Sequence, residues 1–101
     1  MLDAYLYGGK RSAFGRHGGV MARVRPDDML GSVIRDAIAD TAFKGEDFDD
    51  VIIGCGNQAG EDSRCVARHA GLLAGLPIEV PGQVIQRNCA SGLSAIIAAA
   101  H

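Results

Sequence analysis

The sequence has no tryptophan, few other aromatic residues and no long hydrophobic run. Only 5% of its 101 residues are aromatic, whereas 48% are hydrophobic and 22% are charged. No apolar stretch approaches the ~18 residues that span a bilayer, and no basic N-terminus precedes an apolar stretch, so we expect neither a membrane segment nor secretion. The net charge of -2 and the apolar content exclude a disordered or nucleic-acid-coating chain. The composition predicts one globular domain at most.

Cysteine is also scarce. The three cysteines form no Cys-x-x-Cys pair, and an odd number without a secretory context predicts reduced thiols in the cytoplasm. The histidines at 17, 69 and 101 have no metal-ligand spacing among themselves or with the cysteines. We therefore expect neither a disulfide framework nor a metal site.

Glycine, by contrast, is abundant, and charge is unevenly distributed. A basic glycine-rich loop, residues 8–26, holds five Lys or Arg and no acid, whereas residues 27–50 hold eight acids. This asymmetry is typical either of an anion site or interface, or of a solvated loop beside a solvated helix, and both interpretations stay open. In neither loop 8–26 nor 54–60 does the glycine spacing fit a nucleotide-binding loop.

Hydrophobic periodicity predicts alternating strands and helices. Strands are expected at 3–7, 51–53 and 83–86, and helices at 26–42, from a cap at Asp62 or Ser63 through 73, and at 90–101. This order predicts an α/β fold with mainly parallel strands. The last helix is apolar and lacks a polar end, so we expect residues 1–101 to be an incomplete, N-terminal part of a larger protein.

Cys89 stands where an expected strand runs into an expected helix. A thiol there faces unpaired helix N–H groups and the positive end of the helix dipole, which favour thiolate, and Arg87 is a nearby cation. The small residues 90–92 leave the sulfur accessible. Residues 86–92 therefore resemble a strand–nucleophile–helix elbow; the alternative is a buried structural cysteine, as we interpret Cys55 and Cys65.

Residues 87–96, Arg-Asn-Cys-Ala-Ser-Gly-Leu-Ser-Ala-Ile, resemble the nucleophile segment of the thiolases, the acetyl-CoA acyltransferases. Further segments resemble the same family in its order and spacing: residues 10–16, 50–54, 67–68 and 74–77. Residues 58–64 look most like the 3-oxoadipyl-CoA thiolase subgroup. Two departures are Ser12-Ala13, where the family usually has Thr-Pro, and Gln86, where many relatives have Asn.

The resemblance implies a layered αβαβα fold, of which this chain supplies the first β-α-β-α-β-α segment, and an acyltransferase with Cys89 as its catalytic nucleophile. It implies acyl-CoA and CoA as substrates, no covalently bound cofactor, and a homodimer or homotetramer in which loop 8–26 meets acids of a partner or of another part of the full chain. The family's basic histidine and second cysteine lie in motifs absent from residues 1–101, so we expect the isolated chain to be inactive or nearly so. Alternatives are a ketoacyl-synthase-type condensing enzyme and a non-catalytic, truncated interaction module.

Overall fold

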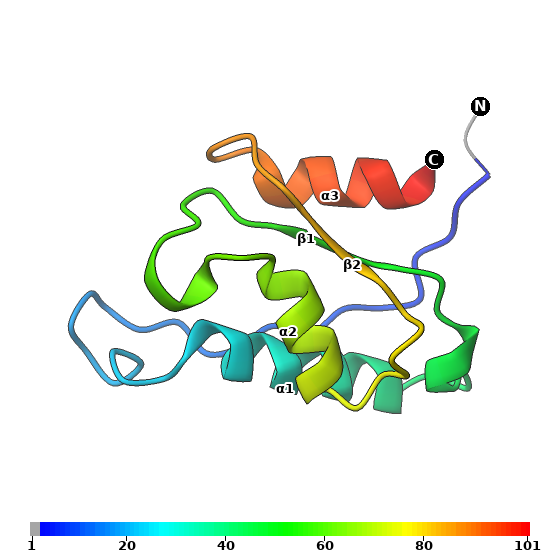
Figure 1. The fold of residues 1–101 in the computed structure, drawn as a ribbon, viewed down its shortest axis with the longest axis horizontal. Helices are drawn as coiled ribbons and strands as arrows, with labels where there is room; N and C mark the ends of the chain where they lie inside the picture. The colour runs from blue at the N-terminus through cyan, green and yellow to red at the C-terminus, as the bar shows by residue number, and fades with distance from the viewer. Residues whose placement is uncertain (1–2) are drawn as a thin grey trace.

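The computed structural model describes residues 3–101, which form helices around a small parallel sheet. In chain order the elements are α1 (Pro26–Ala39), η1 (Gly45–Asp47), β1 (Val51–Gly54), η2 (Gly60–Asp62), α2 (Val66–Leu73), β2 (Gly82–Ile85) and α3 (Ser91–Ala100). In Figure 1, α3 lies on one face of the sheet and α2 on the other, and α1 packs against α2. The predicted α/β class is confirmed.

The sheet consists of β1 and β2, which pair in parallel from Val51 opposite Gly82 to Gly54 opposite Ile85. Both strands lie within one residue of their predicted positions. The connection between them contains α2, whose backbone comes very close to β2: a Cβ added to Gly82 would lie 2.7 Å from the Arg68 nitrogen. Glycine at this position therefore allows the helix to pack directly on the strand.

The first helix has the predicted start but ends earlier than predicted. Pro26 occupies the first helical turn, where its missing N–H needs no partner, and two aspartates follow it. The helix ends at Ala39 rather than at Ala42, because the Thr41 N–H and hydroxyl both donate to the Ile38 carbonyl, at 2.9 and 2.8 Å. These two bonds close a turn that cannot continue as helix.

The predicted cap of α2 was wrong. Asp62 is the last residue of η2, and the Ser63 hydroxyl donates to the Gly60 carbonyl at 2.8 Å instead of accepting from the helix. Cys65 precedes the first helical residue, Val66, with a left-handed φ of 63° and no side-chain cap. The short 3₁₀ helix thus uses the residues that the sequence pattern assigned to capping.

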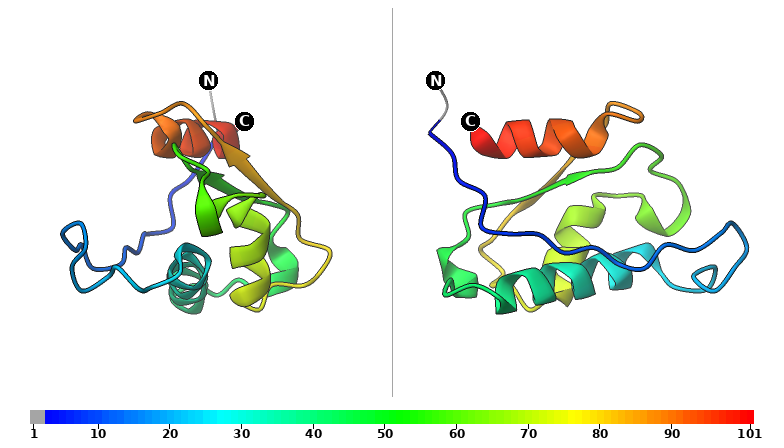
Figure 2. Two further views of the ribbon diagram at one scale, coloured as in Figure 1. Left: turned by 60° about the vertical axis from the view of Figure 1, so that its left-hand side comes forward. Right: turned by 180° about the vertical axis from the view of Figure 1, so that it is seen from behind.

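The strand predicted at 3–7 is also wrong, since this segment pairs with no other strand among residues 3–101. It runs past the sheet toward the end of α1 (Figure 2), where the Tyr7 ring meets Phe43 edge-on at 5.0 Å. Leu6 is 88% exposed. An alternating sequence forms a strand only where a neighbouring strand supplies hydrogen bonds, and none is present here.

The core centres on α2, and its residues are mostly small. The buried apolar residues are Val66, Ala67, Ala70, Leu76, Val80 and Ala95. By contrast, α3 leaves Leu93, Ile96 and Ile97 between 48% and 64% exposed. No helix within residues 3–101 combines the length and apolar character needed to cross a membrane.

Candidate functional site

The turn between β2 and α3 presents Cys89 to solvent. Cys89 lies two residues before Ser91, the first residue of α3, and its side chain is exposed. In Figure 1 this turn projects beyond the sheet at the N-terminal end of α3. The cysteine therefore lies at the strand-to-helix junction where the sequence placed it, and it is not a buried structural residue.

The hydroxyl of Ser91 holds this turn closed. It accepts the Arg87 N–H at 2.8 Å and donates to the Asn88 carbonyl at 2.7 Å. The Asn88 carbonyl also accepts the Ser91 N–H at 3.2 Å. Although the turn is exposed, Ser91 itself is only 4% exposed. Sequence reasoning treated Ser91 only as a small residue beside the sulfur and missed this role.

A second side chain, that of Gln86, ties the turn to the loop after β1. Its Oε1 accepts the Asn88 N–H at 3.1 Å, and its Nε2 donates to the Gly56 carbonyl at 3.3 Å. Asn88 has a left-handed φ of 49°, a conformation that asparagine tolerates better than most residues. Gln86 therefore makes two hydrogen bonds beside Cys89.

Two glycines let the loop after β1 approach the Cys89 turn. A Cβ added to Gly54 would overlap the Ser91 backbone and lie 2.5 Å from the Gly92 nitrogen. A Cβ added to Gly56 would lie 3.0 Å from the Asn88 carbonyl oxygen. The ends of both strands and the start of α3 therefore meet at backbone contact.

The start of α3 offers unpaired backbone donors near the sulfur. The N–H groups of Cys89, Gly92 and Leu93 donate to no acceptor within residues 3–101, and no side chain caps the helix. Such groups, with the helix dipole, stabilise a nearby negative charge. The Arg87 guanidinium makes no ion pair among the described residues, and its effect on the thiol stays a prediction.

The other two cysteines have different surroundings. Both are half-buried. The Cys55 thiol donates to an Asp62 carboxylate oxygen at 3.6 Å, and the Cys65 thiol donates to the Gly82 carbonyl at 3.3 Å. Of the three thiols, Cys89 is thus the exposed one, beside unpaired N–H groups.

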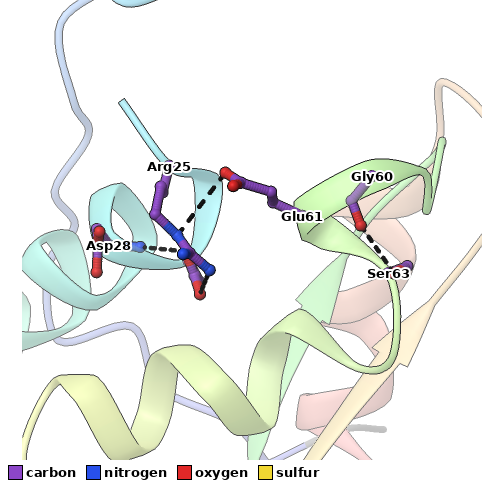
Figure 3. A network of polar contacts seen from close by, with 6 residues as sticks. Arg25, Asp28, Gly60, Glu61 and Ser63 are labelled. Carbon is purple, nitrogen blue, oxygen red and sulfur yellow. Dashed lines mark hydrogen bonds and ion pairs between the residues drawn. The ribbon is translucent and has the colours of Figure 1, made fainter. Parts of the chain in front are cut away.

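The basic loop 8–26 is attached to acids of the same chain near both of its ends. Arg25 donates to both carboxylate oxygens of buried Asp27, each at 3.2 Å, and approaches a Glu61 oxygen at 3.7 Å (Figure 3). The Arg25 hydrogen bonds lower the pKa of Asp27 below its ordinary value. Lys10 pairs with Asp40. The remaining three basic residues of the loop form no ion pair within residues 3–101.

A cavity of about 440 Å³ lies elsewhere, between residues 5–10 and the end of α1, and none of its lining residues belongs to the Cys89 turn. Within the part of the chain that the structure describes, no three His, Cys, Asp or Glu side chains gather in a way that could hold a metal ion.

Comparisons with known proteins agree on one family. The family model described as "Thiolase, N-terminal domain" matches residues 4–101. A 3-oxoadipyl-CoA/3-oxo-5,6-dehydrosuberyl-CoA thiolase of Escherichia coli is 48% identical over 95% of this chain and 24% of its own. A beta-ketoadipyl-CoA thiolase of Acinetobacter baylyi is 47% identical over 100% of this chain and 25% of its own. The chain thus spans about a quarter of the length of these curated relatives.

Solved structures give the same result. Human mitochondrial 3-ketoacyl-CoA thiolase, solved in complex with CoA, matches with a TM-score of 0.83 and 33% identity, over 90% of this chain and 23% of its own. The acetyl-CoA acetyltransferase of Bacillus anthracis matches with a TM-score of 0.75 and 36% identity, over 82% of this chain and 21% of its own.

Proposed function

Because the chain belongs to the thiolase family, we propose that it supplies the nucleophile of an acyltransferase, and that this nucleophile is Cys89. One observation carries the proposal. Cys89 is the exposed cysteine and lies beside unpaired N–H groups at the start of α3, whereas the other two thiols are half-buried and hydrogen-bonded. An accessible thiol near positive backbone dipoles is the setting in which cysteine reacts as thiolate.

In the proposed reaction, the Cys89 thiolate forms a bond to the 3-keto carbon of a 3-ketoacyl-CoA. The bond between carbons 2 and 3 then breaks, and its electron pair leaves with acetyl-CoA, which takes up a proton. The thiol of a second CoA attacks the acyl-cysteine, loses its proton, and releases a shortened acyl-CoA and the Cys89 thiolate. The unpaired Cys89 N–H is the oxyanion donor that this chain contributes. The reverse condensation uses the same nucleophile.

The relatives suggest the substrate class. Several that are 42–48% identical carry names of 3-oxoadipyl-CoA or beta-ketoadipyl-CoA thiolases. We therefore propose a 3-ketoacyl-CoA whose acyl chain ends in a free carboxylate.

We further propose that residues 1–101 act as part of a larger thiolase, in a homo-oligomer, and are inactive or nearly so alone. The apolar side chains Leu93, Ile96 and Ile97 are exposed on α3, and an apolar helix face of this kind is normally covered by further protein. Neither the family's basic histidine motif nor its second cysteine motif occurs in this sequence, so residues 1–101 do not supply the acid–base groups that the family resemblance implies.

Two experiments test the nucleophile. In the 101-residue chain, iodoacetamide labelling followed by peptide mass spectrometry should modify Cys89 faster than Cys55 and Cys65. In a chimaera whose other three quarters come from the Escherichia coli relative, incubation with a 3-ketoacyl-CoA without free CoA should place an acyl group on Cys89. The matched variants are Cys89→Ala, which should abolish CoA-dependent turnover, and Cys65→Ala, which should retain it.

Equal labelling of all three cysteines in the folded chain would contradict the accessibility on which the proposal rests. An acyl adduct on another residue of an active chimaera, or turnover that survives Cys89→Ala, would overturn the assignment of the nucleophile.

A further inference from the structure

The turn that carries Cys89 is closed by two side chains that do not belong to the cysteine's own reaction. Ser91 and Gln86 together bind three backbone groups of the turn: the Arg87 N–H, the Asn88 N–H and the Asn88 carbonyl. All three precede Cys89 directly. The position of the sulfur therefore depends on these hydrogen bonds as well as on the helix that follows.

We propose that Ser91 and Gln86 are positioning residues for the Cys89 sulfur, an inference that rests on the proposed nucleophile. Ser91 is the inner brace, because it is buried and its hydroxyl joins the residues before Cys89 to the first residue of α3. Gln86 is the outer brace, because its amide joins Asn88 to Gly56 in the loop after β1. The turn is thus held from α3 on one side and from the end of β1 on the other.

The braces oppose a local conformational preference. Asn88 adopts a left-handed φ of 49° immediately before Cys89, a conformation less favourable than right-handed or extended backbone and one that surrounding contacts must hold. Both its N–H and its carbonyl are held by the two braces. Without them, Asn88 can relax and carry the sulfur away from the unpaired N–H groups at the start of α3.

The two braces differ in burial, and this difference makes the proposal testable. Gln86 is exposed, so its replacement leaves the core intact. Gln83 is a matched control: it is exposed on β2 and its side chain also donates a hydrogen bond, at 2.7 Å to Asp50, but it does not touch the turn. Ser94 in α3 is the control for Ser91, because its side chain makes no hydrogen bond among the described residues.

The test measures iodoacetamide labelling of each cysteine in the 101-residue chain at pH 7. Gln86→Met and Ser91→Ala should each slow Cys89 labelling by roughly 3- to 10-fold, the change expected from losing one or two hydrogen bonds. Gln83→Met and Ser94→Ala should leave it unchanged. Ser91→Thr retains a hydroxyl and should restore most of the rate.

A merely structural role predicts a different pattern. Loosening of the fold would speed labelling of the half-buried Cys65 and would not slow that of exposed Cys89, so Cys65 reports on loosening within the same molecule. Circular dichroism identifies any variant that fails to fold. If Ser91→Ala unfolds, the Cys89 labelling rates of Gln86→Met and Gln83→Met still test the proposal. Slower labelling in Gln86→Met alone supports it, and equal rates overturn it.

Failure of the inference and failure of the proposed function are distinguishable. Preferential labelling of wild-type Cys89 that is unchanged in folded Gln86→Met and Ser91→Ala would overturn the positioning role alone. Absence of preferential labelling in the wild type would overturn the nucleophile on which both rest.

Discussion

Replacement of Gly54 by alanine tests how closely the end of β1 approaches the start of α3. The added Cβ would overlap the Ser91 backbone and lie 2.5 Å from the Gly92 nitrogen, whereas an ordinary contact begins at 3.4 Å. The obstacles are main-chain atoms, which cannot rotate away. The strand end and the helix start must therefore separate by about 0.9 Å or more, the difference between these two distances.

The cost of this separation follows from known overpacking effects. Forcing a methyl group into a packed interior costs about 1–3 kcal/mol, and we expect about 2 kcal/mol here after allowing for the lower unfolded-state entropy of alanine. For a domain of this size, a loss of that amount lowers the Tm by roughly 8–16 °C. Because the displaced helix start lies beside Cys89, the labelling rate of Cys89 should fall as well.

Gly71 provides the matched control. It is a buried glycine within α2, but the nearest atoms to an added Cβ are side-chain carbons of Leu76 and Val51 at 3.6 Å, an ordinary contact distance. Gly71→Ala should therefore raise stability by about 0.8 kcal/mol through helix propensity. Thermal unfolding followed by circular dichroism at 222 nm measures both variants. A Gly54→Ala Tm within about 2 °C of the wild type, or equal losses in both variants, would refute the close approach.

Three further substitutions test other contacts. Ionised Asp27 stabilises the fold at pH values above its ordinary pKa of 3.8, and this contribution is lost as the pH falls through its lowered pKa. Asp27→Asn should therefore flatten the acid-induced fall in the free energy of unfolding, as measured by urea titration. The Arg68 guanidinium donates at 2.6 and 3.0 Å to two carbonyls of the α2–β2 connection. Arg68→Lys cannot make both hydrogen bonds with one planar group and should lower the free energy of unfolding by about 1 kcal/mol. An unchanged midpoint of urea-induced unfolding would disprove this prediction. Exposed Arg64 has a φ of 60°, so Arg64→Gly should raise the Tm by a few degrees, corresponding to up to about 1 kcal/mol, and a lower Tm would contradict the left-handed backbone.

Periodicity in the sequence predicted those elements whose partners lie within the chain. The apolar run at 51–53 and the repeat that begins at Pro26 each form the expected element, because each packs against a neighbour that these residues supply. The segment 3–7 has an equally clear alternation but no strand beside it, and its pattern alone could not reveal that. The cap of α2 failed for a local reason: Ser63 has two competing uses for its hydroxyl, and the bond to the Gly60 carbonyl prevails.

The sequence could predict where the Cys89 thiol lies, but not the hydrogen bonds that surround it. Strand, turn and helix signals around Cys89 were enough to place a thiol at a helix start, and the small residues after it indicated access. The hydroxyl of Ser91 and the amide of Gln86 gave no comparable signal, because their hydrogen bonds depend on the left-handed backbone at Asn88. No sequence pattern distinguishes an asparagine that will adopt this conformation from one that will not.

Parallel pairing is the step that converts these separate features into one site. Because β1 and β2 run in the same direction, Gly54 lies opposite Ile85 and both strands end at the same edge of the sheet. The loop after β1 must then pass beside the turn that carries Cys89, and the glycines at 54 and 56 allow it to do so at backbone contact. Gln86 joins the two connections at this edge. The turn that carries Cys89 is therefore attached to both connections at this edge of the sheet, although the cysteine itself is exposed.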